Sequence, residues 1–375
     1  MSASVPFLDL HLHDDEAAVH EAIARVLARG WFVLGPEVDA FEQEFAAASR
    51  VPHAVAVGNG TDAIALALRA AGIEAGDEVI VPAMTAAYTA LGVTMVGARP
   101  VFCDVDPVRC TMDAGAAAAA VTSRTAALVP VHLYGQAADV PALQAVAARH
   151  GLAVIEDCAQ AHLATCAGVP VGTTSTAGTF SFYPTKNLGA LGDGGAVVTR
   201  DAALARRVAC LRNGGQLARY EHVEAGINSR LDDLQAAVLR TRLHLLPAWT
   251  ERRRDLARRY RAALAGAPVA CPGEVDAGHV YHLFAARSPA RDRLRAHLAQ
   301  QGIETLVHYP VPLNRQPAFV QQSGGAFPEA EALAREQVSL PLYPAMPASH
   351  IDAVVDAVHQ FGPAAPLDEP RRAIR

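Results

Sequence analysis

The sequence predicts an α/β protein built around a mostly parallel β-sheet. Short apolar runs rich in β-branched residues alternate with longer stretches of helical periodicity through the first half of the chain. The runs are nearly continuous in their apolar character, which is typical of strands buried on both faces. Since 51% of the 375 residues are hydrophobic and 19% are charged, the chain can bury a large core.

The expected elements of this first half follow one another as strand, helix and strand. Strands are predicted at residues 54–57, 78–81, 100–103, 126–131, 153–155, 178–182 and 196–199. Amphipathic stretches predict helices at 61–71, 137–150 and 201–211. This alternation places helices on both faces of the sheet.

The second half has a different pattern. Residues 229–259 indicate one long, arginine-rich helix, with a kink or break expected at Pro247. Further elements are expected as apolar runs at 280–286 and 305–307 and as helices at 290–301 and 352–359. We therefore expect a large domain over residues 1–250 and a small α+β domain over residues 251–375, with the N-terminal segment packing on the small domain.

Composition excludes several classes of function. A net charge of −6 gives no basic surface for nucleic acid. No uninterrupted apolar run reaches the roughly 18 residues of a membrane span, and the N-terminus lacks the pattern of a secretion signal. The six cysteines form no C-x-x-C pair, so we expect no metal site and a reducing, cytoplasmic location.

Lys186 is the only lysine among 32 Lys and Arg residues. This bias indicates that arginine has replaced lysine wherever positive charge alone is needed. A lysine amine can lose its proton and attack a carbonyl, whereas a guanidinium stays protonated. Lys186 is therefore a candidate nucleophile; the alternative is that one lysine survived by chance.

Two further segments could bind a ligand. Gly58-Asn59-Gly60-Thr61-Asp62 follows a strand and begins a helix, where free N–H groups attract phosphate. Its alternative is a plain turn with a capping residue. Asp157 ends another strand, at the edge where open α/β sheets bind ligands. Its alternative is a structural cap, beside a solvated Glu156 and a structural His162.

These features together point to pyridoxal phosphate (PLP). A loop lysine would hold the cofactor as a Schiff base, and an acid at a strand end would keep the pyridine nitrogen protonated. The N–H groups at the helix start would hold the cofactor phosphate. No metal is needed in this interpretation.

The chain resembles the DegT/DnrJ/EryC1/StrS sugar aminotransferases, which are PLP enzymes of the aspartate-aminotransferase fold (fold type I). The matching segments run in order from about residue 5 to residue 358. They are GNGTDAIALALRA, GDEVIVPAMT, ARPVFCDVDP, VPVHLYGQAADV, VIEDCAQAH, FSFYPTKNLGALGDGGAVVT, RNGG with GINSRLDDLQAAVL, and SLPLYPAMP. The combination of EDCAQAH with SFYPTKNLG is the most specific of these.

The resemblance implies roles for individual residues. Lys186 would bind the cofactor and carry the proton, and Asp157 would pair with the pyridinium nitrogen. Gln160 would lie near the 3′ oxygen of the cofactor.

It also implies a phosphate site and a partner subunit. Gly60, Thr61 and Ser181 would hold the cofactor phosphate. Asn228 of the GINSR segment would reach the cofactor phosphate of a neighbouring subunit, which implies a homodimer with composite active sites. The sequence alone favours the alternative that Asn228 is a turn residue before the helix that starts near Arg230.

Substrate contacts are less defined by the motifs. Candidates for holding the diphosphate or the sugar are Tyr183, Arg219, Tyr220, Arg230, His308, Tyr309 and Asn314. Two positions depart from the family pattern. Ala86 stands where many relatives have an aromatic residue over the cofactor ring, which leaves open whether Tyr88 covers it. Asn314 stands where relatives often have histidine.

The reaction implied by the resemblance is transamination of a nucleotide-linked keto sugar, with L-glutamate as amino donor. The loop NLGALGDGG is similar to that of sugar 3-aminotransferases, which favours a dTDP-3-keto-6-deoxyhexose as substrate. A 4-keto sugar, a keto-cyclitol, or a non-catalytic sensor that binds PLP or a nucleotide sugar remain as alternatives. Lys186 argues against a PLP-dependent dehydratase, and the absence of G-x-G-x-x-G argues against a nicotinamide dehydrogenase.

Overall fold

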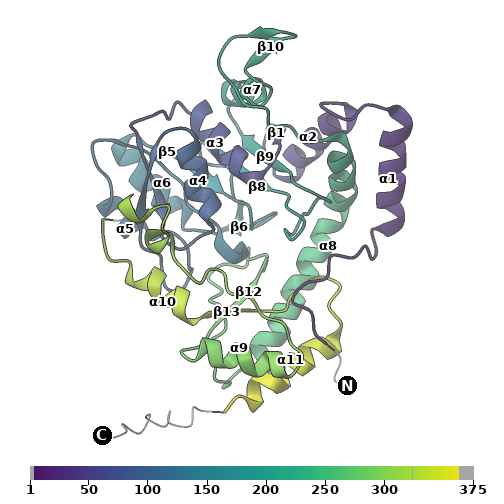
Figure 1. Cartoon of the computed structure of the whole chain (residues 1–375), viewed down its shortest axis with the longest axis vertical. Coiled ribbons are helices and arrows are strands. Elements are labelled where there is room, and N and C mark those ends of the chain that lie inside the picture. The colour runs from purple at the N-terminus through teal and green to yellow at the C-terminus, as the bar shows by residue number, and fades with distance from the viewer. Residues whose placement is uncertain (1–3, 323, 363–375) are drawn as a thin grey trace, which may run out of the picture.

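A seven-stranded sheet forms the centre of the larger part of the molecule (Figure 1). The computed structural model describes residues 4–322 and 324–362. The strand order is β1-β9-β8-β5-β4-β2-β3, and only β9 runs antiparallel to its neighbours. The strands are β1 (His53–Val57), β2 (Glu78–Pro82), β3 (Arg99–Cys103), β4 (Thr125–Leu128), β5 (Ala153–Asp157), β8 (Ala177–Ser181) and β9 (Gly195–Thr199). The predicted α/β class with a mostly parallel sheet is confirmed.

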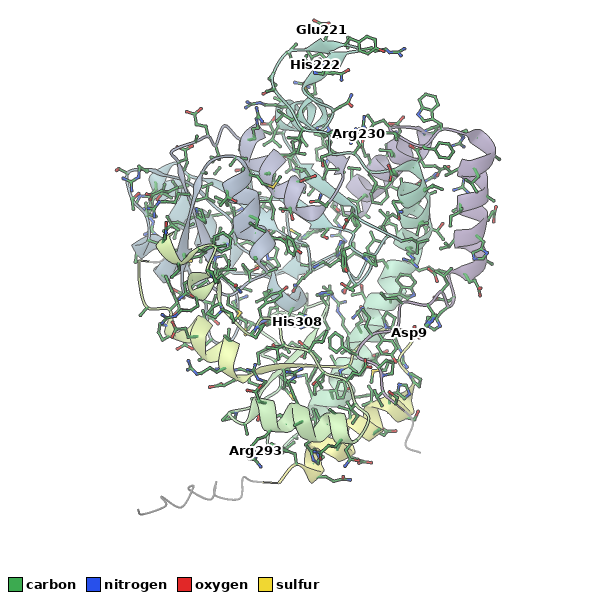
Figure 2. All side chains as sticks on the ribbon, viewed as in Figure 1. Asp9, Glu221, His222, Arg230, Arg293 and His308 are labelled. Atoms are coloured by element: carbon green, nitrogen blue, oxygen red, sulfur yellow. The ribbon has the colours of Figure 1, made fainter. Side chains whose placement is uncertain are left out.

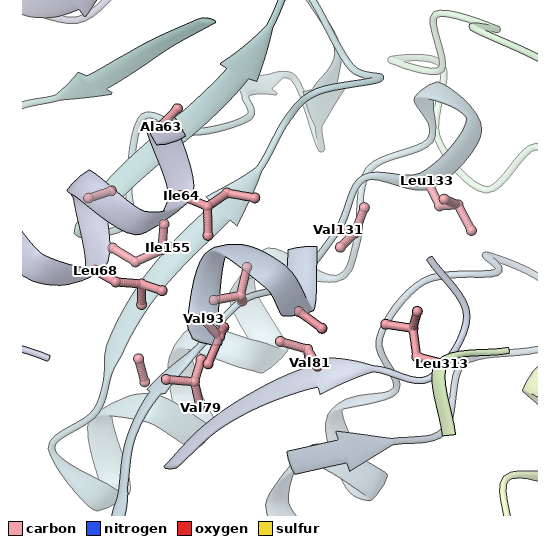
Figure 3. Packing of buried hydrophobic residues seen from close by; sticks show 14 of the residues in the cluster. Ala63, Ile64, Leu68, Val79, Val81, Val93, Val131, Leu133, Ile155 and Leu313 are labelled. Atoms are coloured by element: carbon pink, nitrogen blue, oxygen red, sulfur yellow. The ribbon is translucent and has the colours of Figure 1, made fainter. Parts of the chain in front are cut away.

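Helices cover both faces of this sheet. The bounds are α1 (Glu16–Arg29), α2 (Pro36–Ala48), α3 (Gly60–Ala70), α4 (Ala87–Met95), α5 (Ala114–Ala119), α6 (Val140–His150), α7 (Ala202–Leu211) and α8 (Asp233–Ala263). On one face, Ile64 of α3 and Val93 of α4 pack with Val79 of β2 (Figure 3). The other face packs against α2 and α8 near β1, and against α5 and α6 near β4. Burial on both faces explains why the strands are continuously apolar.

A separate core lies at the C-terminal end of α8. It includes the strand pair β12 (Phe284–Arg287) and β13 (Gln337–Leu340), and the helices α9 (Arg291–Gln300) and α11 (Ala348–Gln360). The N-terminal segment contributes to this core, because Val5 is buried in it and pairs with Ile303. The helix α10 (Pro328–Glu336) packs instead on the large core.

The structure differs from two local predictions. α8 is continuous through the exposed Pro247, so the break considered there is absent, and the alternative of a kink stays a prediction. There solvent can bind the carbonyl that the proline leaves without a donor. Residues 305–307 form no strand; Leu306 makes only an isolated bridge to Ser339, whose strand pairs with β12 instead. The proposed domain boundary at residue 250 falls inside α8 and stays a prediction.

The remaining elements are short. They are β6 (Thr165–Cys166), β7 (Val169–Pro170), β10 (Gln216–Ala218), β11 (Glu221–His222), and the 3₁₀ turns η1 (Leu133–Gly135), η2 (Leu313–Arg315) and η3 (Val320–Gln322). β10 and β11 form a hairpin that projects from the top of the molecule in Figure 1. Within residues 4–322 and 324–362, no helix is both long enough and apolar enough to cross a bilayer.

Candidate active site

Two cavities adjoin at the loop that carries Lys186. The Lys186 cavity has a volume of about 670 Å³ and is also lined by Arg242 and Trp249. The His308 cavity has a volume of about 750 Å³ and is lined on one side by Arg295. Leu8, Thr185 and Arg253 line both cavities, so these form one connected region between the sheet and the smaller core.

The turn before α3 is held by its own side chains and by Ser229. Asn59 caps the helix, because its Oδ1 accepts a hydrogen bond from the Asp62 N–H at 2.9 Å. The Ser229 hydroxyl donates to Asp62 Oδ2 at 2.6 Å and accepts from the Gly58 N–H at 2.9 Å. These hydrogen bonds fix the turn and thereby the orientation of the first N–H groups of α3. N–H groups held in this way at a helix start can bind an anion.

Gly60 and Ser181 touch across two neighbouring segments. A Cβ atom placed at Gly60 would lie 2.7 Å from the Cβ of Ser181, so no larger residue fits without displacement. Thr61 is the second residue of α3. The structure thus brings together all three residues predicted to hold phosphate, and the glycine keeps the cradle open.

Asp157 lies buried at the end of β5. Its Oδ2 accepts from the Thr89 hydroxyl at 2.8 Å, and its Oδ1 accepts from the Ala159 N–H at 3.1 Å. Burial raises the pKa of the carboxyl group, while these donors and the positive charge of Lys186 lower it. A cation placed against Asp157 would lower this pKa and favour the charged carboxylate, so the site fits a protonated ring nitrogen.

Lys186 follows β8 in a turn closed by its N–H, which donates to the Tyr183 carbonyl at 2.8 Å. Its neighbour Asn187 anchors the loop: its side chain bonds the Val280 carbonyl at 3.1 Å and His282 Nδ1 at 3.1 Å. Burial lowers the pKa of Lys186 to about 8, against the opposing charge of Asp157. At pH 7 about a tenth of the amine is then neutral, which is the form that attacks a carbonyl.

The capture of PLP by the apoprotein should therefore accelerate with rising pH. Because the pKa of Lys186 is about 8, the neutral amine accumulates through pH 8 instead of near the usual value of about 10.4. Stopped-flow absorbance between pH 6 and 10 should give a midpoint near 8. Asp157→Asn should move the midpoint lower, since it removes the charge that favours the ammonium form. A wild-type rate that still climbs at pH 10 would contradict the assignment.

Gln160 has a fixed orientation beside these groups. Its Oε1 accepts from the Tyr134 N–H at 2.7 Å, so its Nε2 faces the other way and donates to the Tyr309 hydroxyl at 3.2 Å. His308 Nδ1 bonds the Ser339 hydroxyl at 2.9 Å. Burial, followed by the charge of Lys186, lowers the pKa of His308 to about 4, so this ring is neutral at pH 7.

The hairpin candidates lie far from this group. Tyr220 is 79% exposed, and the Arg219 guanidinium stacks over its ring at 5.0 Å. Figure 2 places Glu221 and His222, the next residues, at the top of the view and His308 near its centre. Arg219 and Tyr220 are thus not brought together with Lys186 within one chain.

Four other candidates have separate surroundings. Asn228 is exposed, and Arg230 bonds Asn213 Oδ1 at 3.4 Å. Tyr183 is 52% exposed, although it precedes Lys186 by three residues. Asn314 is buried, and its Oδ1 has no hydrogen-bond partner among the described residues. These four stay predictions as substrate or cofactor contacts.

Glu156 is not solvated, contrary to the alternative considered for its segment. It is fully buried, and its Oε2 accepts from His132 Nε2 at 2.9 Å and from the Gly172 N–H at 2.8 Å. Cys158 lies close enough to share an ion with this pair. However, His132 Nδ1 already accepts from the Ala138 N–H at 3.0 Å, so the pair has the hydrogen bonds of a structural network.

Sequence reasoning missed Thr89, Ser229 and Arg253. Thr89 bonds Asp157 across 68 residues of sequence, and Ser229 bonds Asp62 across 167. No local spacing signals such pairs. Arg253 stands among other arginines in α8, so its sequence context gave it no distinction.

The chain matches known proteins over most of its length. Residues 13–359 match the model of the DegT/DnrJ/EryC1/StrS aminotransferase family. A dTDP-3-amino-3,4,6-trideoxy-alpha-D-glucose transaminase of Streptomyces venezuelae is 48% identical, over 95% of this chain and 96% of that protein. A dTDP-3-amino-3,6-dideoxy-alpha-D-galactopyranose transaminase of Aneurinibacillus thermoaerophilus is 43% identical, over 96% of this chain and 99% of that protein. The crystal structure of S. venezuelae DesV, in complex with a ketimine intermediate, superposes with a TM-score of 0.93 at 48% identity, covering 95% of this chain and 98% of that one.

Proposed function

The chain belongs to the DegT/DnrJ/EryC1/StrS aminotransferase family, and from this membership we propose that it transfers an amino group to C3 of a nucleotide-activated keto sugar. The favoured substrate is a dTDP-3-keto-6-deoxyhexose. The observation that carries the proposal is the position of Lys186, with its lowered pKa, in the wall of a cavity within electrostatic reach of buried Asp157.

The protein is a PLP-dependent aminotransferase, and the residues of the site fit that cofactor. When bound, PLP supplies an electron sink that stabilises negative charge at the carbon losing its proton. Lys186 would hold the cofactor, Asp157 its ring nitrogen and Gln160 its 3′ oxygen. Gly60, Thr61 and Ser181 form the open cradle for its phosphate.

The protein side chains supply the proton transfer. Lys186 is the only described amine that lines the cavity, and burial keeps part of it neutral at pH 7. In that form it accepts a proton from the amino donor and returns one to the aminated sugar carbon. Thr89 and the Ala159 N–H keep the Asp157 carboxylate oriented while this happens.

The choice of C3 rests on the loop after Lys186 and on the relatives. Two relatives over 40% identical are named for products that carry the amine at C3. The two cavities give room for a sugar, since Lys186 lines one of them and His308 lines the other. L-glutamate is the proposed donor, and a 4-keto sugar or a keto-cyclitol remains the alternative acceptor.

A homodimer with composite active sites is part of the proposal. The hairpin carries the apolar side chain of Leu217 and the ring of Tyr220, both largely exposed in the single chain. A second exposed apolar stripe runs along α4 through Tyr88, Leu91 and Met95, at helical spacing. In a two-fold dimer these surfaces would be covered, and Arg219, Tyr220 and Asn228 would reach the partner's cavity. The free cysteines suit the proposed cytoplasmic location.

The decisive assay offers 3-keto and 4-keto dTDP-sugars to the holoenzyme with L-glutamate. We expect turnover of the 3-keto sugar to be at least about tenfold faster, because a misplaced carbon lowers the rate steeply. NMR of the product should show nitrogen on C3. A product aminated at C4 would overturn the proposed regiochemistry but leave the enzyme class unchanged.

A further inference from the structure

Arg253 is a buried cation at the junction of the two cavities. It lies in the C-terminal half of α8, its side chain is 4% exposed, and it lines both the Lys186 cavity and the His308 cavity. A fully enclosed arginine is rare unless it is paired, so its partners decide what it does.

Only one edge of the guanidinium is used by the protein. Nη1 donates to the carbonyl oxygens of Tyr281 at 3.2 Å, His282 at 3.3 Å and Leu342 at 3.0 Å. Nε is buried without a hydrogen-bond partner. Over the described parts of the chain, Nη2 has no acceptor either. Since Nε is closed to solvent, Nη2 is the donor that remains available to a ligand.

No carboxylate compensates the charge of Arg253 within the described residues. Its pKa is lowered to about 10 by burial alone, so it stays positive at neutral pH. Other buried arginines differ: Arg242 pairs with Asp15 at 2.7 Å, and Arg212 pairs with Glu42. Because an unpaired buried charge is strongly unfavourable, the position of Arg253 indicates an anion supplied by a ligand.

We propose that Arg253 binds a carboxylate of the amino donor. This inference rests on the proposed function, in which the donor nitrogen must reach the Lys186 cavity. An amino acid carries its carboxylates within a few bonds of that nitrogen, and Arg253 lines the same cavity. A carboxylate oxygen can accept a charge-assisted hydrogen bond from Nη2. The cofactor phosphate already has its cradle at Gly60 and Ser181.

The test is the concentration of donor that decolourises the holoenzyme at half its maximal rate. In Arg253→Lys this concentration of L-glutamate should rise about 10- to 100-fold, the usual loss when a charge-assisted hydrogen bond is removed. The maximal rate and the half-saturating keto sugar concentration in the reverse half-reaction should change little. A variant that merely loosened the fold would alter both half-reactions together.

The identity of the carboxylate follows from two amides. L-glutamine lacks the side-chain carboxylate, and isoglutamine lacks the α-carboxylate. One of these amides lacks the carboxylate that Arg253 binds. That amide should be a weak amino donor for the wild type, and Arg253→Lys should bind it as well as the wild type does. If the half-saturating concentrations of L-glutamate and of both amides rise by the same factor in Arg253→Lys, Arg253 does not bind a carboxylate.

Arg254→Lys is the matched control. Arg254 is the next residue of α8 and also donates to a carbonyl, that of His279 at 3.0 Å, but it lines neither cavity. Its replacement should leave donor binding unchanged. An equal loss in Arg254→Lys would show that any arginine of this segment acts through the fold.

A crystal of the wild-type holoenzyme soaked with 2-oxoglutarate needs no variant to fold. A carboxylate within hydrogen-bond distance of Arg253 supports the proposal, and a carboxylate bound elsewhere in the cavities overturns it. If L-glutamate fails to decolourise the wild type, the proposed donor is wrong. The soak still shows whether Arg253 takes a carboxylate, so the two failures are distinguishable.

Discussion

Lys186→Ala should abolish transamination, with kcat falling by at least about 10⁴-fold. The chain has no other lysine, and its arginines stay protonated at any working pH. Without a neutral amine the site loses both its covalent anchor for PLP and its proton carrier, which act as one unit. The variant should be colourless after dialysis. Borohydride reduction followed by peptide mapping should label the wild type at position 186 and leave the variant unlabelled.

Two further variants separate chemistry from folding. Lys186→Arg keeps the charge and the length, so it should fold like the wild type and remain inactive. Co-expression of Lys186→Ala with a chain carrying Arg219→Ala and Tyr220→Ala should recover about a quarter of the wild-type activity, because random pairing makes about half of the dimers mixed and each mixed dimer has one complete site of two. Activity in purified Lys186→Arg, or label at another residue, would refute the role of Lys186.

Asp157→Asn should lower kcat about 10²- to 10³-fold while the protein still binds PLP. The amide preserves the shape and can keep one bond to Thr89, but it cannot hold a proton on the ring nitrogen. The absorbance of the bound cofactor should shift, because the protonation of its ring changes. Thermal unfolding should be little altered, since the buried carboxyl group already carries a raised pKa.

Thr89→Val serves as the graded control for this variant. It removes one hydrogen bond to Asp157 and leaves the carboxylate, so we expect a loss of about tenfold or less. Asp157→Asn turning over within tenfold of the wild type would mean that Asp157 does not pair with the ring.

The sheet could be predicted from the sequence because its signals are local. Residues 79–82 of β2 and the whole of β9 are buried on both faces, so every residue in these runs is apolar or small. β13 escaped prediction, because Gln337 and Ser339 interrupt its pattern. Both are fully buried and bond each other at 2.7 Å, which satisfies their polar groups in a way that only the fold creates.

The site divides in the same way. Lys186, Asp157 and Gly60 sit at strand ends and helix starts, where residue type and position already carry meaning. Arg253 could not be found from the sequence. It stands out because it has no carboxylate partner among the described residues and donates to carbonyls of two distant segments, and both features exist only in the folded chain. In the proposed homodimer the surroundings of Arg219 would include a second chain, which no spacing within one sequence describes.

The uninterrupted course of α8 has a mechanical consequence. One rod joins the two cores, with Leu239 and Leu246 seated in the large one and Leu256 and Tyr260 in the small one. Its weakest point is Pro247, because proline has no N–H group and one backbone hydrogen bond of the helix is missing there. Bending of α8 at Pro247 would move the part of the helix after it, with Arg253, relative to Lys186. A single proline therefore sets where the distance between the two cores can change.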